Sequence, residues 1–217
     1  MSSKKKLVEI CHKVYAKGFV AAYDGNISCR ISDSTILITR SGICKGDVKE
    51  KDLIKIDLNG KTVSGKGKIS TEHKIHLLAY QKRKEVNSVV HCHPVYATAF
   101  ALLGEGLDKH YLPEVFLTIG KVPLCKYATP STDKVPKSLE PYIDHSWAML
   151  LQNHGAVTLG KNLDDAYFKM EKLEHAAKII LLARLLGTPK VLSKKNIDDI
   201  LNISSSTYGI IPDIRNI

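Results

Sequence analysis

The spacing of apolar residues predicts helices towards both ends of the chain. In segment 7–15 apolar side chains recur every three or four positions, which predicts a helix that stops at Gly18. The longest helical pattern covers 163–186 and ends at Gly187. A short final helix is expected around 197–203, followed by a serine-rich tail.

Two further helices are expected in the middle of the chain. Ser70 and Thr71 have hydroxyl side chains that can cap a helix ending near Lys84. Pro94 is expected to open another helix, which ends near Gly104. Segment 130–136 has a proline at each end and is expected to be a loop.

Residues typical of strands form the rest of the pattern. Segments 27–31 and 35–39 predict one hairpin, and a second is expected where 53–58 meets Asn59-Gly60 and returns over 61–63. Further strand-like segments are 87–91, 122–127, 147–152 and 157–160. No repeat or long linker divides the chain. We therefore expect one α/β domain over residues 1–217 with a sizeable sheet.

The composition is that of an ordinary globular protein. The 217 residues are 44% hydrophobic and 25% charged, which excludes a disordered or low-complexity chain. The apolar runs are far shorter than the ~20 residues of a membrane-spanning helix. The N-terminus has no signal-peptide pattern, and the five cysteines are scattered without a CxxC pair. These features predict reduced thiols and a cytoplasmic protein with no membrane partner.

The net charge of +10 raises the question of an anionic partner. It comes from 32 Lys and Arg against 22 Asp and Glu, and the basic residues are spread along the chain. Aromatic residues make up only 6% and do not alternate with basic ones, as they would on a surface that stacks bases. We therefore expect a solvated lysine-rich surface and no nucleic-acid partner. A nucleic-acid surface and the steering of a phosphorylated substrate stay alternatives.

The tripeptide His91-Cys92-His93 is the most informative chemical signal in the sequence. Residues two apart on a strand face the same side, so both imidazoles can reach one metal ion. His154 lies at a break between two strand-like runs and precedes Gly155, which permits close approach of the backbone. Three histidines with an open fourth position are typical of a catalytic zinc site. The alternatives are polar strand-end histidines and, for His154, a turn residue bonded to a carbonyl.

Glu72 begins a predicted helix, where the helix dipole favours its ionised form. It can serve as a displaceable metal ligand, as a base, or simply as a capping residue. The other histidines, including His73 and His76, are interpreted as structural or surface residues. Backbone amide, hydroxyl and side-chain amide groups suited to phosphate occur at Gly25-Asn26, Ser41-Gly42 and Ser70-Thr71. Such pairs are also ordinary turn residues.

Seven short blocks, taken in chain order, resemble the class II aldolase/adducin family and, within it, the aldolases that act on L-fuculose 1-phosphate. The blocks are DGNIS at 24–28, TRSG at 39–42, STE at 70–72, VVHCH at 89–93, YA at 127–128, QNHG at 152–155 and TYG at 207–209. The resemblance implies a single-domain, three-layer α/β/α fold around a central, largely antiparallel sheet. It also implies a cytoplasmic homotetramer with sites at the subunit interfaces and one Zn²⁺ per subunit.

The resemblance also implies a role for each matching residue. His91, His93 and His154 would bind zinc, and Glu72 would be the catalytic acid/base and displaceable ligand. Tyr208 falls where a C-terminal tyrosine closes over the site. The implied phosphate-binding residues are Asn26, Ser41, Gly42, Ser70 and Thr71. The chain departs from the family in one respect, because segment 112–119 lacks the tyrosine that protonates the aldehyde oxygen.

The implied reaction is the reversible cleavage of a 1-phosphoketose, such as L-fuculose 1-phosphate, to dihydroxyacetone phosphate and a short aldehyde such as lactaldehyde. Zinc would stabilise the negative charge that develops as the carbon-carbon bond breaks, and Glu72 would shuttle the proton. Three other reactions on the same scaffold are alternatives: cleavage of 5-deoxyribulose 1-phosphate, dehydration of methylthioribulose 1-phosphate and 4-epimerisation of ribulose 5-phosphate. A catalytically silent binding module is the non-enzyme alternative.

Overall fold

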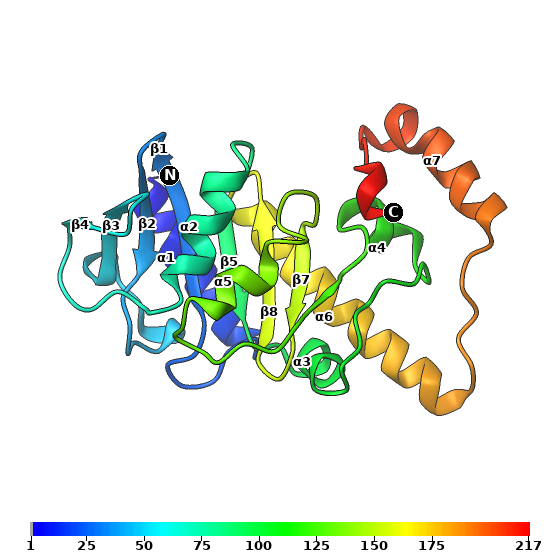
Figure 1. The fold of residues 1–217 in the computed structure, drawn as a ribbon, viewed down its shortest axis with the longest axis horizontal. Helices are drawn as coiled ribbons and strands as arrows, with labels where there is room; N and C mark the ends of the chain where they lie inside the picture. Colours follow the sequence, from blue (N-terminus) through cyan, green and yellow to red (C-terminus); the bar gives the residue numbers. More distant parts are fainter. Residues whose placement is uncertain (1) are drawn as a thin grey trace.

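A single eight-stranded sheet forms the centre of the protein (Figure 1), in the order β4-β3-β2-β1-β5-β8-β7-β6. The structure is a computed structural model that describes residues 2–217, apart from the side chains of Tyr208 and Ile214. The strands are β1 (Asn26–Ser32), β2 (Thr35–Thr39), β3 (Leu53–Asp57), β4 (Thr62–Ser64), β5 (Ser88–Cys92), β6 (Leu124–Cys125), β7 (Ala148–Leu151) and β8 (Gly155–Gly160). Neighbouring strands are antiparallel except for the parallel pair β6 and β7.

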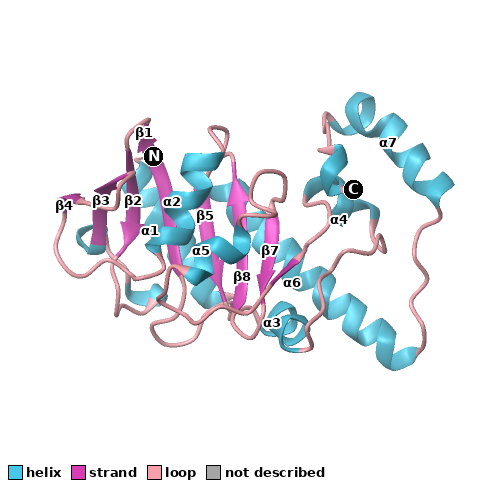
Figure 2. Cartoon of the chain, viewed as in Figure 1, coloured by secondary structure: helices cyan, strands magenta, loops and turns pink. Residues whose placement is uncertain are grey.

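Helices cover both faces of the sheet (Figure 2), with α2 and α5 in front and α6 behind. The helices are α1 (Ser3–Ala16), α2 (His73–Lys82), α3 (Val95–Leu102), α4 (Pro113–Thr118), α5 (Lys134–Leu139), α6 (Leu163–Leu186) and α7 (Lys194–Tyr208). One apolar core joins α1, α3 and α6 to the sheet, and a second joins α2 and α5 to it. The single-domain three-layer α/β/α fold with a largely antiparallel sheet is therefore confirmed.

The register of the central strands determines which end of the sheet carries the site. Asn26, the first residue of β1, pairs with His91 near the end of β5, and Cys92 pairs with Ala156 near the start of β8. Because β5 is antiparallel to both neighbours, β1 and β8 begin where β5 ends. Three segments that are distant in the sequence therefore meet at one sheet end.

Both predicted hairpins are confirmed, as β1 pairs with β2 and β3 pairs with β4. Two elements begin earlier than the apolar pattern predicts. Helix α1 starts at Ser3, because the Ser2 hydroxyl accepts a hydrogen bond from the backbone of Lys5 and caps it. Strand β8 starts at Gly155. No described helix combines the length and apolar character needed to cross a membrane.

Four other elements differ from the prediction. The strand expected over 122–127 shortens to β6, and the loop expected over 130–136 is helical from Lys134 onwards. The apolar pattern does not predict α4, although Pro113 at its start is a common helix opener. Helix α7 is longer than 197–203, because Ser193 and Asn196 form a capping box that starts it earlier and it continues through the serines.

The start of α2 also corrects a prediction. Its N-cap position is occupied by Glu72, and no side chain accepts a capping hydrogen bond there. The Ser70 hydroxyl accepts a hydrogen bond of 3.3 Å from the Glu72 backbone, and the Thr71 hydroxyl bonds to Ser131 over 2.7 Å. Ser70 and Thr71 therefore do not cap the helix, and capping does not explain Glu72.

Candidate metal centre and active site

Three histidines meet at the end of the sheet where β5 stops. His91 is in β5, His93 follows directly after it, and His154 occupies the turn before β8. Their ring centroids lie 4.9 to 5.1 Å apart. One nitrogen of each ring lies within 4.8 Å of the others, which makes the trio a possible metal site. The structure therefore brings the three predicted ligands together.

The hydrogen bonds of these rings fit a metal-binding role. His91 Nδ1 lies 3.0 Å from the carbonyl oxygen of Ala156, to which it donates its N–H. His93 Nδ1 lies 3.5 Å from Asp24 Oδ2. The Nε2 atoms of His91 and His93 are buried and make no hydrogen bond among the described residues, although the Glu72 carboxylate lies 3.2 Å from His91 Nε2. Buried nitrogens of this kind need a partner, and a divalent metal ion supplies one.

The His93 ring is in the protonation state that a metal ligand needs. Burial, together with the neighbouring His91 and His154, lowers the pKa of His93 to about 4. The imidazole is therefore neutral near pH 7 and keeps a lone pair for a cation. No proton has to leave this ring before a metal binds.

The Glu72 carboxylate faces the histidine cluster. Its Oε2 lies 3.2 Å from His91 Nε2, and its Oε1 lies 3.1 Å from His154 Nε2. Burial alone would raise the pKa of Glu72, but the contacts with His154 and His91 outweigh it and hold the pKa well below its usual range. Glu72 is therefore an ionised carboxylate beside the histidines, where it can ligate a metal or accept a proton from a bound molecule.

A cavity of about 230 Å³ opens over this cluster. It is lined by Tyr23, Asp24, Gly25, Asn26, Arg40, Ser41, Gly42, Ser70, Glu72, His93 and His154. Four of the five predicted phosphate-binding residues are among them. Thr71 is not, because its hydroxyl points to Ser131 instead.

Some of the hydrogen-bond donors in the cavity that could bind a phosphate are already engaged. The backbone N–H of Ser41 already donates to the Lys68 carbonyl over 2.8 Å, so Ser41 can offer only its hydroxyl. The Arg40 guanidinium is paired with Asp52 over 2.9 Å. Gly42 has a φ of +69° and its backbone N–H has no partner within the described structure. The Asn26 side-chain NH₂ group is also engaged, because it donates to Ser70 Oγ over 3.3 Å and to Glu72 Oε2 over 3.1 Å. The available donors are therefore two hydroxyls and a backbone N–H.

Lys45 is a site-supporting residue that the sequence does not reveal. It is 1% exposed, and its Nζ donates to the carbonyl oxygens of Tyr23 over 3.2 Å and Ile43 over 2.9 Å. It thus ties together the two segments that flank the cavity. Lys45 and Lys169, which is 8% exposed, are buried exceptions to the expected solvated lysine-rich surface. Lysine is rarely buried, so the residue type at these two positions does not signal their burial.

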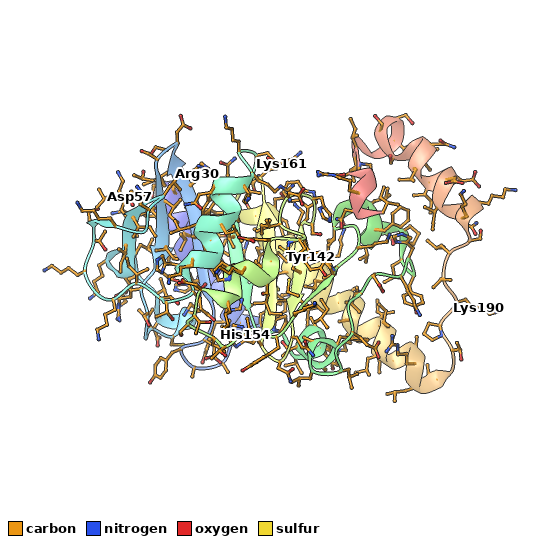
Figure 3. The ribbon with its side chains drawn as sticks, in the orientation of Figure 1. Arg30, Asp57, Tyr142, His154, Lys161 and Lys190 are labelled. Atoms are coloured by element: carbon orange, nitrogen blue, oxygen red, sulfur yellow. The ribbon has the colours of Figure 1, made fainter. Side chains whose placement is uncertain are left out.

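Two tyrosines of interest lie away from the histidines of the same chain. Tyr208 is the last residue of α7, and its side chain lies outside the described part of the structure. Figures 1 and 3 show α7 beyond the β7 side of the sheet, away from the labelled His154. Tyr111, directly before segment 112–119, lines a separate cavity together with Glu105 and Arg184. The described residues that line the histidine cavity include neither Tyr111 nor Tyr208.

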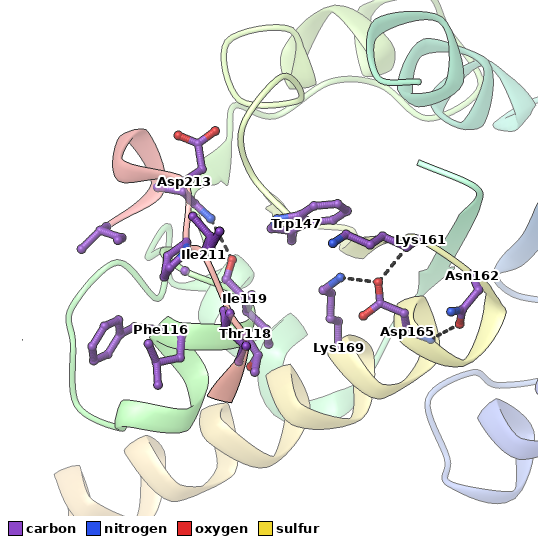
Figure 4. A pocket seen from close by; sticks show the side chains of 17 residues that line it. Phe116, Thr118, Ile119, Trp147, Lys161, Asn162, Asp165, Lys169, Ile211 and Asp213 are labelled. Carbon is purple, nitrogen blue, oxygen red and sulfur yellow. Dashed lines mark hydrogen bonds and ion pairs between the residues drawn. The ribbon is translucent and has the colours of Figure 1, made fainter. Parts of the chain in front are cut away.

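A second cavity of about 430 Å³ lies between the C-terminal segment and α6 (Figure 4). Its charges are mostly paired, since Lys169 Nζ lies 2.7 Å from Asp165 Oδ2. The cationic groups of Lys169 and Arg83 each lie 4.0 Å from the centre of the Trp147 ring. Its described lining includes no histidine and none of the predicted site residues. The smaller cavity is therefore the candidate active site.

Replacing Gly155 with alanine is expected to displace a metal ligand. A Cβ at this position would lie 2.5 Å from His93 Cδ2 and 2.6 Å from the Cys92 carbonyl. We expect metal affinity to fall by about tenfold or more, measured by titration of the metal-free protein. Gly46→Ala is the control, because its Cβ would meet Tyr15 at 2.7 Å, away from the histidines. Equal metal affinity in both variants would contradict the prediction.

Comparisons with known proteins identify relatives of this chain. The family profile described as Class II Aldolase and Adducin N-terminal domain matches residues 5–181. A 3-oxo-tetronate 4-phosphate decarboxylase of Pectobacterium atrosepticum is 35% identical over 207 residues, which cover 93% of this chain and 92% of that protein. An L-fuculose phosphate aldolase of Methanocaldococcus jannaschii is 33% identical over 183 residues, covering 84% and 98% respectively.

A solved structure supports the same relationship. An L-fuculose 1-phosphate aldolase superimposes with a TM-score of 0.84 at 31% identity, covering 91% of this chain and 93% of that one. The matches confirm the predicted resemblance and are consistent with a lyase. Since the profile covers most of the sequence and relatives above 30% identity span nearly all of it, this chain belongs to the class II aldolase/adducin family.

Proposed function

We propose that this chain is a zinc-dependent aldolase that cleaves a 1-phosphoketose to dihydroxyacetone phosphate and a short aldehyde. L-fuculose 1-phosphate, which would release lactaldehyde, is the first candidate substrate. The observation that carries the proposal is the meeting of His91, His93 and His154 with Glu72 in one cavity. The relatives named as L-fuculose phosphate aldolases support the choice of substrate.

Zinc is the metal that the donor set favours. Three imidazoles with a side open to the cavity are typical of catalytic zinc sites. When bound, the ion supplies Lewis-acid stabilisation of negative charge on substrate oxygens. The open side faces Glu72 and the phosphate-type donors, so a bound sugar phosphate and the carboxylate share one space.

The chain's own residues supply binding and proton transfer. The hydroxyls of Ser41 and Ser70 and the N–H of Gly42 would hold the phosphate at one end of the cavity, and Asn26 would orient the Ser70 hydroxyl beside it. Cleavage breaks the bond between C3 and C4: the C4 hydroxyl loses its proton to a base as the aldehyde forms and leaves, and C3 takes up a proton. Glu72 is the carboxylate placed to deliver that proton and to remove it in the reverse direction.

Decarboxylation is a second candidate, favoured by the relative named 3-oxo-tetronate 4-phosphate decarboxylase. Loss of CO₂ from a 3-oxo-tetronate 4-phosphate also leaves dihydroxyacetone phosphate. The two reactions share the phosphate, the ketone and the protonation of one carbon. They differ at the leaving group, because only aldol cleavage needs a proton transfer at an aldehyde oxygen. Segment 112–119 has no tyrosine, so aldol cleavage needs another residue at that oxygen, whereas decarboxylation does not.

The other reactions of the scaffold are distinguished by their products. Dehydration of methylthioribulose 1-phosphate and epimerisation of ribulose 5-phosphate release no triose phosphate. Cleavage of 5-deoxyribulose 1-phosphate releases triose phosphate with a different aldehyde. A silent binding module would have no reason to keep three histidines and Glu72 together in one cavity.

The deciding experiment assays the metal-loaded protein with L-fuculose 1-phosphate, other 1-phosphoketoses and 3-oxo-tetronate 4-phosphate. We expect dihydroxyacetone phosphate and an equal amount of lactaldehyde from the first substrate, and no turnover after treatment with a chelator. CO₂ in place of aldehyde would select the decarboxylase. The proposal fails if no substrate releases triose phosphate, or if the thoroughly demetallated protein is fully active.

We also propose a homotetramer in which Tyr208 of one subunit completes the site of the next. Helix α7 lies beyond the β7 side of the sheet, whereas the histidines lie at the end of β5 (Figure 1). Because α7 lies away from the histidines of its own chain, the proposal places a closing C-terminal tyrosine at the site of a neighbouring subunit. Tyr111, before α4, lies towards the same side, and α4 contacts α7.

Mixing two inactive variants tests this arrangement. Tyr208→Phe and His93→Ala should each be impaired alone, but hybrid oligomers contain sites with intact histidines from one subunit and Tyr208 from its neighbour. We expect activity to return on mixing after reversible dissociation. A monomer with full activity, or hybrids that recover no activity, would contradict the shared site.

We infer that the protein works in the cytoplasm without a nucleic-acid or membrane partner. The inference rests on five free cysteines, four of them buried, which suit a reducing compartment. Failure to retain DNA at low ionic strength would support the nucleic-acid part, since charge-driven binding is strongest there.

A further inference from the structure

A row of polar side chains runs between α2 and β1, beneath the candidate active site. Glu72, His76 and Tyr80 follow one another at intervals of four residues and so share one side of the helix. Ser28 lies two residues after Asn26, so both point to the same face of β1. His76 and Ser28 are fully buried, and Tyr80 is 2% exposed. The row therefore lies within an apolar core.

The row is a continuous hydrogen-bonded chain. Tyr80 OH lies 2.7 Å from Ser28 Oγ, and Ser28 Oγ lies 2.6 Å from His76 Nδ1. On the other side of the ring, His76 Nε2 lies 2.5 Å from Asn26 Oδ1. The opposite end of the Asn26 amide, Nδ2, donates to Glu72 Oε2 over 3.1 Å. The chain thus reaches from the interior to the carboxylate beside the histidines.

The donors and acceptors in this row of hydrogen bonds can be arranged in only one direction. With Asn26 Nδ2 donating to Glu72, Asn26 Oδ1 must accept, so His76 Nε2 carries the proton. Burial lowers the pKa of His76 to about 3, so its ring is neutral and Nδ1 is an acceptor. Ser28 therefore donates to Nδ1 and accepts from Tyr80, whose pKa is raised by burial and which keeps its proton.

We propose that His76 is a positioning residue that fixes the Asn26 side-chain amide with its NH₂ group towards Glu72 and Ser70. The reversed amide would place Asn26 Oδ1 against the Glu72 carboxylate, an arrangement of two acceptors. Asn26 Nδ2 also donates to Ser70 Oγ over 3.3 Å, so one amide orients both the base and a phosphate-type hydroxyl. This inference rests on the proposed function, because it assigns His76 a role in the same site.

The tautomer of His76 is testable without any substrate. Nitrogen NMR of ¹⁵N-histidine-labelled protein, with the signal assigned by its loss in His76→Gln, separates the two neutral tautomers from the charged ring. We expect protonated Nε2 and unprotonated Nδ1 throughout pH 6 to 8. A proton on Nδ1 with bare Nε2, or a charged ring at neutral pH, would overturn the assigned direction of the chain.

Three variants separate positioning from core packing. His76→Leu removes the donor to Asn26 and is expected to lower kcat/KM by about 10-fold to 100-fold at unchanged metal occupancy. His76→Gln keeps a donor near the same place and should recover most of that loss. Tyr80→Phe removes only the far end of the chain, because Ser28 can still donate to His76, and should cost much less activity than His76→Leu.

Thermal stability measured on the same three variants identifies a purely structural role. If the activity of the variants simply follows their folded fraction, the positioning inference is wrong. This holds even when release of triose phosphate confirms the proposed function. It is also wrong if His76→Leu keeps full activity at equal metal content. If the proposed function fails and no substrate turns over, the NMR experiment still decides the orientation of the chain. The two failures are therefore distinguishable.

Discussion

The His93→Ala variant is expected to lose its bound metal and its activity together. In the unsubstituted protein, His93 Nε2 is buried without a hydrogen-bond partner among the described residues. The centroid of the His93 ring lies 5.1 Å from that of His91 and 5.0 Å from that of His154. Two remaining imidazoles would hold a divalent ion much more weakly. Because Lewis-acid stabilisation is worth several kcal/mol, kcat/KM should fall by about 10³-fold or more.

Metal analysis of the purified variant by mass spectrometry, alongside turnover, checks this result. His175→Ala is the matched control, because it makes the same change at an exposed histidine of α6. The control should keep both metal and activity. Full metal occupancy in His93→Ala would rule out the assigned ligand set, whatever the effect on turnover.

The Glu72→Gln variant is expected to separate metal binding from chemistry. The amide keeps the size of the side chain but cannot accept the proton that a carboxylate accepts. General acid-base groups contribute about 10²- to 10⁴-fold, so turnover should fall by that order. The three imidazoles remain, so metal should stay bound.

Single-turnover measurements on metal-loaded protein distinguish slow chemistry from weak substrate binding. Glu140→Gln is the control, since Glu140 is exposed and the described structure shows no side-chain partner for it. Unchanged turnover in Glu72→Gln would reject Glu72 as the base. Loss of metal in this variant would show that the carboxylate is chiefly a ligand.

The metal cluster illustrates what a local pattern can predict. His91 and His93 converge because strand geometry brings residues two apart to one side, which holds wherever β5 lies in the fold. His154 is different, because its approach depends on the pairing of β5 with β8, more than 60 residues along the chain. Its place before Gly155 made His154 a candidate, and the resemblance to a family assigned it as the third ligand, which local periodicity alone could not do.

The buried polar chain illustrates what local patterns miss. The four-residue spacing of Glu72, His76 and Tyr80 is visible in the sequence, but it equally describes an ordinary helix face. Asn26 and His76 are 50 residues apart, and only the packing of α2 on β1 joins them. Lys45 likewise lies in a lysine-rich stretch and is buried only because two backbone carbonyls receive its ammonium group.

The sequence by itself determined the α/β class, both hairpins, most helices and the histidine and glutamate residues of the candidate site. The elements follow from spacing and turn chemistry within a few residues, and the resemblance to the family implied the roles of the site residues. The tertiary structure alone decided that His91, His93, His154 and Glu72 share one cavity and that His76 supports it. The physical reason is that sheet pairing and helix docking are long-range, so they bring together groups whose local sequences carry no sign of each other.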